Sequence, residues 1–261
     1  MTWSEMQPLL EQACWDTLYM VGWSAVIAVV GGLPLGIVLV LTDRGGLLGN
    51  APANKVIGQI VNITRSMPFI ILMVALLPFT RAVTGTTIGR EGAIVPLAIG
   101  AIPFFARLVE TAIREVDGGL VEAVQSMGGS TWTVVRKVLV PEALPSLIAG
   151  ITTTVVVLIG YSAMAGSVGA GGLGDIAIRY GYMRFETELM WITVAILAAV
   201  ISLIQFTGDY AARGIHRRGR GGAPAPRLRL LSAGRSAARV ATAPGAESVT
   251  GTATAKEPRP Q

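Results

Sequence analysis

Five stretches of mostly apolar residues alternate with more polar segments along the chain. The clearest stretch runs from Leu18 to Leu41 and holds 24 residues without a charge, whereas about 20 helical residues suffice to cross the apolar core of a bilayer. The others are expected at about residues 56–79, 88–106, 144–168 and 189–208. The pattern therefore predicts an all-α polytopic membrane protein with five transmembrane helices.

The second and third of these spans are less regular than the others. Arg65 lies inside the second span, and the uncharged part of the third, residues 92–106, is only 15 residues long. At 1.5 Å per residue this part covers roughly 22 Å of an apolar core that is roughly 30 Å thick. Either the polar residues before it contribute to the span, or the helix stops partway.

The composition agrees with a membrane protein. Hydrophobic residues make up 52% of the chain and charged residues 14%, whereas soluble domains carry about 25% charged residues. The single cysteine, Cys14, and the single histidine, His216, allow no disulfide within the chain and no histidine-based catalytic triad. We also expect no metal site, because no cluster of histidine and cysteine ligands is available.

Basic residues divide unequally between the two sets of loops. One side holds Arg44, Lys55, Arg65, Arg107, Arg114, Arg136, Lys137 and the residues after 212, and the other holds Arg81, Arg90, Arg179 and Arg184. Lysine and arginine accumulate in cytoplasmic loops. We therefore expect the N-terminus outside and the C-terminus in the cytoplasm.

The chain is expected to comprise a short N-terminal segment (residues 1–13), a membrane domain (14–212) and a basic tail (213–261). The tail holds ten of the 21 lysines and arginines and few large apolar residues, a composition typical of disorder. A basic tail is compatible with nucleic-acid binding, but beside a membrane span it more simply contacts anionic lipid. We therefore expect membrane lipids, and no nucleic acid, among the partners.

A polar segment with helical patterns lies between the third and fourth spans, at residues 122–145. We expect two short helices joined by a turn at Gly128-Gly129, with Ser130 or Thr131 capping the second helix. Pro141 and Pro145 are expected to end that helix and lead back into the membrane. The segment is either a docking element for a cytoplasmic partner or a linker that lies against the bilayer.

The spacing within this segment resembles the EAA loop of ABC importer permeases. The family pattern is Glu-Ala-Ala, three residues, Gly, nine residues, Ile, any residue, Leu and Pro, and the matching positions here are Glu122, Ala123, Val124, Gly128, Val138, Val140 and Pro141. The three departures are valines, which are small and aliphatic like the residues they replace. The resemblance implies a type I importer permease fold, in which residues 122–145, hereafter the coupling loop, seat in a groove of a cytoplasmic ATPase.

Four further segments, at residues 62–72, 77–97, 136–145 and 160–182, resemble the permeases of methionine uptake transporters, and the resemblance covers about residues 13–212. It implies ATP-driven import of D- or L-methionine, or both, across the bacterial inner membrane. A permease for another small amino acid or related solute is the alternative.

The resemblance also implies the partners of the chain. These are two copies of the ATPase, an extracytoplasmic substrate-binding protein anchored by lipid, and a second copy of the chain in a homodimer. The chain itself has no G-x-x-x-x-G-K-[ST] phosphate loop. ATP is therefore expected on the partner subunit, with no cofactor and no enzymatic activity on this chain.

Two other classes of function compete with import by a separate ATPase. An ion-coupled secondary transporter would show intramembrane carboxylates and an inverted repeat, but the first, fourth and fifth spans hold no Asp or Glu, and five spans do not form two equal halves. A receptor or scaffold for a cytoplasmic complex is the weaker alternative, and solute movement would distinguish it.

Two groups of residues are candidates for the solute pathway or its gate: Arg65, Ser66 and Met67, and Tyr161, Ser162 and Met164. Arg65 either extends to the lipid headgroups or points into the pathway. The residues around Tyr161 either line the path or form a helix interface.

A glycine-rich run at residues 169–174, Gly-Ala-Gly-Gly-Leu-Gly, satisfies the dinucleotide pattern G-x-G-x-x-G. That pattern requires a preceding strand, whereas this run follows a membrane helix. We expect it to allow close helix packing instead.

Overall fold

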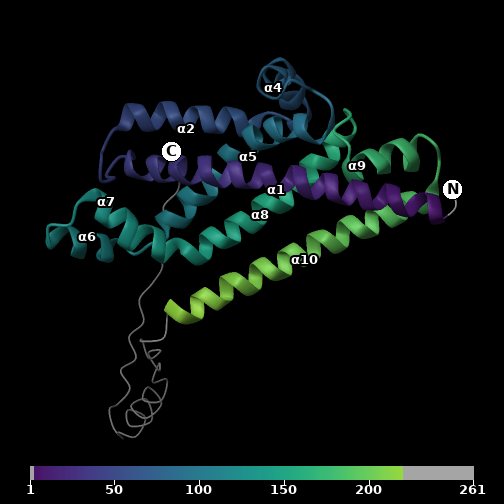
Figure 1. The fold of residues 1–261 in the computed structure, drawn as a ribbon. Coiled ribbons are helices and arrows are strands. Elements are labelled where there is room, and N and C mark those ends of the chain that lie inside the picture. The colour runs from purple at the N-terminus through teal and green to yellow at the C-terminus, as the bar shows by residue number, and fades with distance from the viewer. Residues whose placement is uncertain (1–2, 220–261) are drawn as a thin grey trace, which may run out of the picture. The chain divides into compact units, whose positions relative to one another are not determined.

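The computed structural model describes residues 3–219, and all regular structure within them is helical (Figure 1). The four longest helices are α1 (Trp3–Leu41), α5 (Gly89–Arg114), α8 (Val140–Gly166) and α10 (Thr187–Gly219). The shorter elements are α2 (Ala51–Ser66), α3 (Phe69–Ala75), α4 (Leu77–Thr84), α6 (Gly118–Ser126), α7 (Thr131–Val134) and α9 (Gly172–Ile176), with π-helical turns η1 (Val135–Leu139) and η2 (Ala177–Tyr182).

Four continuous helical stretches are long and apolar enough to cross a membrane. They are Trp3–Leu41, Gly89–Arg114, Thr131–Gly166 and Thr187–Ile215. Helices α2 and α3 pass the same test only as a pair, and they meet at a bend of 105°. The part of the chain that the structure describes therefore has four spans, or five if the bent pair is one span, which agrees with the predicted all-α membrane fold.

The second span is not the single helix expected at residues 56–79. The chain bends between Ser66 and Phe69, where Met67 adopts an extended backbone (φ −77°, ψ 131°). Pro68 follows Met67, and a proline both lacks an N–H donor and disfavours the helical conformation of the residue before it. The second apolar stretch is therefore divided into α2, α3 and the beginning of α4.

The third span is longer than expected. Helix α5 begins at Gly89 and continues to Arg114, past the predicted end at residue 106. The polar residues before Gly92 contribute to the span, which was one of the two possibilities that the sequence left open. Arg107, Glu110 and Arg114 consequently belong to a helix and not to a loop.

Neither Pro141 nor Pro145 ends the second helix of the coupling loop, contrary to expectation. The chain is helical without interruption from Thr131 to Gly166. The π turn η1 ends at Leu139, two residues before Pro141, and the N–H of Val140 bonds the carbonyl oxygen of Val135. The changed hydrogen-bond pattern falls where the missing proline N–H would interrupt a regular α-helix.

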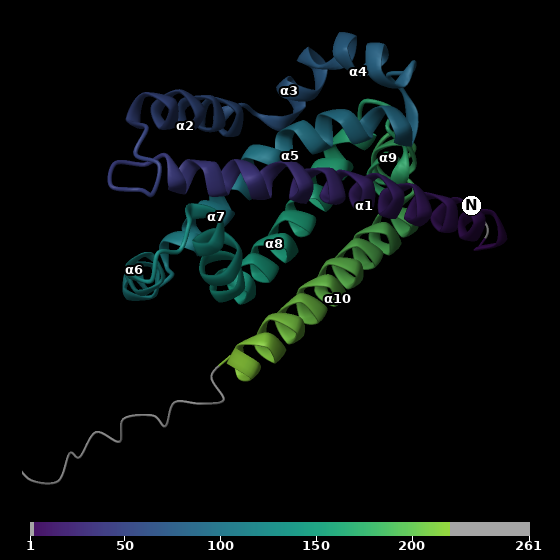
Figure 2. The ribbon, with the colours of Figure 1, turned by 60° about the vertical axis from the view of Figure 1, so that its left-hand side comes forward.

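The elements at the two ends of the membrane domain differ (Figures 1 and 2). Helices α6 and α7 lie at one end, beside the end of α1 and the beginning of α2, and we call this the α6 end. The N-terminus and α9 lie at the opposite end, the α9 end, where the N–H of Gly89 bonds the carbonyl oxygen of Gly169 at 2.9 Å. Helices α1 and α5 both run toward the α6 end and pack along each other more extensively than any other described pair.

Three apolar clusters of the described residues hold these helices together. One contains Leu97 and Leu158, a second, nearer the α6 end, contains Phe105 and Leu139, and a third contains Leu10 of α1, Leu173 of α9 and Leu189 of α10. Helix α10 is covered less than the other long helices: only 11% of its most apolar 18-residue stretch is buried within the chain. Its exposed large apolar side chains, among them Trp191, Leu203 and Phe206, are therefore available to lipid or to another protein chain.

The glycine-rich run at 169–174 packs closely against neighbouring helices, as the sequence predicts. A Cβ atom at Gly174 would lie 2.4 Å from the backbone of Ala163. The N–H of Leu173 donates to Thr17 Oγ1 at 2.9 Å, which joins the run to α1. No strand precedes the run in residues 3–168, so the dinucleotide interpretation has no structural support.

The expected domain boundaries fall within helices. Most of the predicted N-terminal segment, residues 1–13, belongs to α1, and α10 continues past residue 213, where the tail was expected to begin. Residues 220–261, which make up most of the predicted tail, lie outside the described residues. The described helices form one compact unit.

Candidate functional site

The coupling loop folds into two helical parts joined by a glycine turn: α6, and the beginning of the continuous helix that starts with α7. The Asp117 side chain accepts the N–H of Gly119 at 2.8 Å and caps α6, and Ser130 Oγ accepts the N–H of Thr133 at 3.3 Å and caps α7. Between the two caps, Gly128 has a φ of +80°, a left-handed conformation that glycine adopts without steric cost. The structure thus confirms the predicted turn and the predicted cap at Ser130.

One face of α6 is packed and the other is exposed. Val121 and Val124 pack against the apolar cluster that α5, η1 and α8 form at the α6 end. Glu122, Ala123 and Gly128 are exposed. The coupling loop therefore has a fixed base and a free outer surface.

The remaining positions of the EAA pattern lie on the helix that follows the turn. Val138 and Val140 are half-buried in η1 and at the beginning of α8, and Pro141 is exposed. The pattern therefore has an outer part on α6 and a supporting part on the next helix.

Two large apolar side chains stand on the outer surface of the coupling loop. Met127 is 79% exposed and Trp132 is 69% exposed. Large exposed apolar groups with polar surroundings are typical of interaction surfaces. Neither residue was among the predicted site residues, although a tryptophan in an otherwise polar loop was an available signal.

A cavity of about 470 Å³ lies between α6, the end of α1 and the end of α5. Arg114, Glu122 and Gln125 supply polar groups to it, and Leu41 and Leu139 supply apolar surface. Glu122 therefore borders this cavity as well as the exposed surface.

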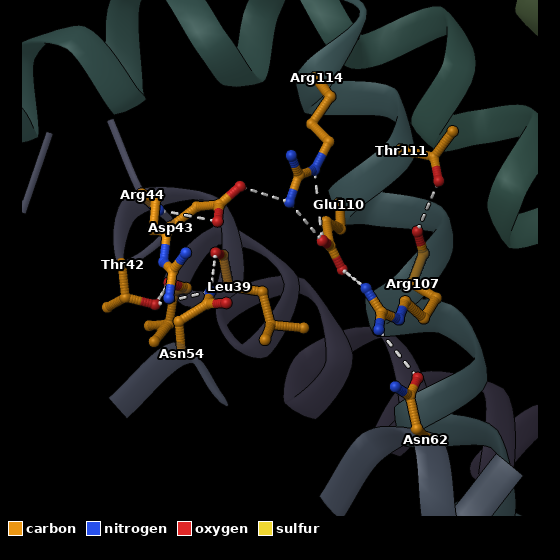
Figure 3. Close-up of polar contacts among 11 residues, drawn as sticks. Leu39, Thr42, Asp43, Arg44, Asn54, Asn62, Arg107, Glu110, Thr111 and Arg114 are labelled. Atoms are coloured by element: carbon orange, nitrogen blue, oxygen red, sulfur yellow. Dashed lines mark hydrogen bonds and ion pairs between the residues drawn. The ribbon is translucent and has the colours of Figure 1, made fainter. Parts of the chain in front are cut away.

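Four charged side chains, each linked to the next by an ion pair, lie beside the base of the coupling loop (Figure 3). Glu110 Oε2 accepts from Arg107 Nη1 at 2.5 Å, and Glu110 Oε1 accepts from Arg114 Nη2 at 2.8 Å. Arg114 Nη2 also lies 2.8 Å from Asp43 Oδ2. Glu110 is only 5% exposed, and a buried carboxylate is tolerated where opposite charges and hydrogen bonds compensate for its lost hydration.

Asp43, the last of these four charged residues, lies in the connection between α1 and α2. The N–H of Arg44 is the strongest group that holds the pKa of the Asp43 carboxyl below its ordinary value, and the Arg114 guanidinium acts in the same direction. Asp43 is therefore negatively charged at neutral pH, and its pairing with Arg114 is lost only as the pH falls through the lowered pKa.

Two asparagines attach α2 to the neighbouring helices. Arg107 Nη2 donates to Asn62 Oδ1 at 2.8 Å, near the end of α2. Asn54 Nδ2 donates to the carbonyl oxygen of Leu39 at 2.6 Å, near the beginning of α2. Helix α2 is thus held to α5 at one end and to α1 at the other.

A second cavity, of about 200 Å³, lies at the bend between α2 and α3. Its lining residues are Thr64, Arg65, Met67, Phe69, Leu72, Gly100, Phe104 and Tyr161. The rings of Phe69 and Tyr161 stack with their centroids 4.3 Å apart and their planes 2° from parallel. The structure thus brings Arg65, Met67 and Tyr161 together in one pocket, hereafter the bend pocket.

The other three candidate pathway residues do not line the bend pocket. Ser66 Oγ donates to the carbonyl oxygen of Asn62 at 2.9 Å, and the buried Ser162 Oγ donates to that of Ile159 at 2.8 Å. Met164 is 45% exposed on α8. Both serines therefore bond within their own helices, and Met164 is available for contacts outside the chain.

Clusters of three or more potential metal-ligating side chains are not found in residues 3–219. The candidate sites are therefore the outer surface of the coupling loop and the bend pocket.

Comparison with known proteins decides the family. The family model of binding-protein-dependent transport system inner membrane components matches residues 32–220. The chain belongs to this family. As one of its members, it is an inner-membrane permease component of an ABC importer, and neither a secondary transporter nor a scaffold.

Two curated relatives of this permease align along almost their whole length. The probable D-methionine transport system permease protein MetI of Vibrio cholerae is 51% identical over 210 residues, which are 80% of this chain and 93% of that protein. The methionine import system permease protein MetP of Bacillus subtilis is 44% identical over 209 residues, which are 80% of this chain and 94% of that protein.

A solved structure described as inward facing conformations of the MetNI methionine ABC transporter is also similar to this permease. One of its chains matches with a TM-score of 0.81 and 46% identity, over 82% of this chain and 99% of that chain. This match confirms the type I importer permease fold.

Proposed function

We propose that this permease imports methionine, as the D form, the L form or both, with energy from a separate ATPase. Both relatives described above are named for methionine transport, and each aligns over more than nine-tenths of its own length. Identity of this extent across the membrane domain supports a shared class of solute. Another small amino acid is the alternative.

The observation that carries the proposal is the geometry of the coupling loop. Its outer surface offers small groups at Ala123 and Gly128, which allow close approach of a partner, and apolar groups at Met127 and Trp132, which can fill pockets. Its base is fixed to α5 and α8 by apolar packing. A groove of the ATPase that holds this surface would therefore move the membrane helices when it moves.

The ATPase, in two copies, binds the ATP, since this chain has no phosphate loop. Five spans are too few to enclose a pathway, so we infer a homodimer with the path along its two-fold axis. The largely unburied α10 and the exposed Met164 on α8 leave surface for the second copy and for lipid. A lipid-anchored substrate-binding protein delivers the solute on the opposite side.

We infer that the α6 end faces the cytoplasm. Basic residues gather there, with Arg44, Arg107 and Arg114 near the ends of α1 and α5 and with Arg136 and Lys137 in η1, and basic residues favour the cytoplasmic side. Helix α1 begins at the α9 end and α10 runs toward the α6 end (Figure 1). This orientation gives an external N-terminus and a cytoplasmic C-terminus.

We assign the bend pocket to the solute pathway. Arg65 supplies a positive charge for an amino-acid carboxylate, and Met67, Phe69 and Tyr161 supply apolar surface for an aliphatic thioether side chain. Its volume of about 200 Å³ suits one small amino acid. The assignment favours the second of the two interpretations of Arg65, in which the side chain points into the pathway.

Reconstitution tests the proposal directly. The permease, its ATPase and its binding protein would be placed in liposomes with ATP and labelled amino acids. We expect ATP-dependent accumulation of methionine, reduced by excess unlabelled methionine and not by lysine or glutamate. Preferential accumulation of another amino acid would replace methionine as the solute, and the absence of any ATP-dependent accumulation by the assembled complex would contradict the proposal.

A further inference from the structure

We propose that Glu110 is a positioning residue that joins the coupling loop to the bend pocket, an inference that rests on the proposed function. Glu110 lies in the last two turns of α5, almost completely buried. Its two carboxylate oxygens bind different arginines, one on each side along the helix (Figure 3). The carboxylate thereby holds both guanidinium groups in fixed positions on one face of α5.

Arg114 is the connection on the side of the coupling loop. It lines the 470 Å³ cavity together with Glu122 and Gln125 of α6. It also pairs with Asp43, in the connection between α1 and α2. A displacement of α6 relative to α5 therefore changes the surroundings of Arg114 before it changes those of Arg107.

Arg107 is the connection on the side of the bend pocket. Its Nη1 binds Glu110 and its Nη2 binds Asn62, so that one guanidinium bridges α5 and α2. Asn62 lies in the last turns of α2, and Thr64 and Arg65, two and three residues further along that helix, line the bend pocket. A rotation of the end of α5 therefore acts on the residues directly before the bend.

The Arg107 guanidinium, which bridges α5 and α2, suits the transmission of movement better than an apolar side chain would. The planar guanidinium of Arg107 carries several donors in fixed directions and can hold two acceptors at once, which a lysine ammonium on a flexible stem cannot do in the same geometry. A buried ion pair is seldom retained for stability alone, because apolar replacements are often as stable. Paired polar groups can also exchange partners between two discrete arrangements.

The test uses variants that break the bridge and leave the buried Glu110 in place. Asn62→Ala removes the acceptor on α2, and Arg107→Lys keeps the positive charge beside Glu110 and removes the second contact. Thr111→Ala is the matched control, because Thr111 Oγ1 bonds only the carbonyl oxygen of Arg107 within α5, at 3.0 Å, and is exposed.

The readouts are ATP hydrolysis and solute uptake by the same reconstituted complexes. For both bridge variants, we expect the amount of solute imported per ATP to fall roughly three- to tenfold, the range that one lost hydrogen bond produces in an equilibrium constant. Binding of the ATPase should be unchanged, and Thr111→Ala should behave as the wild type. Wild-type import per ATP in both bridge variants would overturn the role of Glu110.

A distance measurement separates transmission from a merely structural role. Spin labels at Leu120→Cys on α6 and Ile63→Cys on α2, both exposed positions, would be placed in a Cys14→Ser background. We expect ATP to shift the distance between the labels in the wild-type complex and to shift it less in Asn62→Ala. An equal shift in both complexes would overturn the inference, whereas a wild-type complex that imports nothing would overturn the proposed function on which it rests.

Discussion

The indole of Trp132 is 69% exposed in a loop whose opposite side packs against α5. If this surface binds the ATPase, Trp132→Ala should weaken ATPase binding by about tenfold or more, because tryptophans at interfaces often contribute disproportionately to affinity. The measurement is the affinity of the purified permease for the ATPase. The matched control is Trp191→Ala, since Trp191 is 68% exposed but lies on α10 within a span. Equal losses in the two variants, or none at Trp132, would exclude a docking role.

Arg65 is the residue at which the bend pocket can be tested. We expect Arg65→Ala to raise the KM for solute uptake about tenfold, since a charged hydrogen bond to a carboxylate contributes more than a neutral one. Arg65→Lys, which keeps the charge, should raise it less. If Arg65 extends to lipid headgroups instead, the alanine variant would show lower membrane levels with an unchanged KM.

At the scale of the element, the features that could be predicted from the sequence are those that depend on residues close together in the chain. The turn at Gly128-Gly129 and the cap at Ser130 depend on residues within a few positions of one another, and both were predicted. The bend at Pro68 was not predicted, because a long apolar run follows it and membrane helices tolerate proline. The sharing of one pocket by Arg65 and Tyr161 depends on that bend.

The extent of α5 could not be predicted for a related reason. Three charged residues follow the apolar part of this helix, and a hydropathy pattern treats them as the beginning of a loop. In the structure Arg107 and Arg114 compensate the charge of Glu110, so the helix continues to Arg114. The i, i+3 and i, i+4 spacing of these charges is local and was an available signal for a continued helix. The contacts of the two arginines with Asn62 on α2 and with Asp43 in the α1–α2 connection are not local, and no sequence pattern contains them.

Helix α8 carries the prediction on assembly. If the pathway follows the two-fold axis of a homodimer, Met164, which is 45% exposed on α8, should lie near its counterpart. We expect Met164→Cys in a Cys14→Ser background to form crosslinked permease pairs in membranes. Val30→Cys on α1 is the control, since Val30 is 70% exposed but lies in the first span. Crosslinking at Val30 and none at Met164 would contradict the assignment of α8 to the axis.

At the scale of the whole molecule, the family match ends at residue 220 and the two relatives align over only 209 and 210 residues. The permease function should therefore reside in the residues before this point. We expect removal of residues 222–261 to leave uptake largely intact, with some loss of expression. Loss of uptake at normal membrane levels would show that the tail has an essential partner.

The central claim is that an ATPase drives solute movement through the coupling loop, and Gly128 gives its most direct test. Gly128 has a φ of +80°, and no other group lies within 4 Å of a Cβ atom built there. Gly128→Ala and Gly128→Trp share the strain of a left-handed residue, roughly 1–2 kcal/mol. Only the tryptophan adds bulk on the surface that would enter the ATPase groove, so the alanine variant is the control for backbone strain.

The measurement is ATP hydrolysis and solute uptake in liposomes that contain the complete complex with each variant. We expect Gly128→Ala to retain the ATPase and most of the uptake. We expect Gly128→Trp, at normal protein levels, either to lose the ATPase or to hydrolyse ATP without uptake. Normal ATPase binding and normal uptake in Gly128→Trp would mean that the loop is only a linker, and would contradict the account.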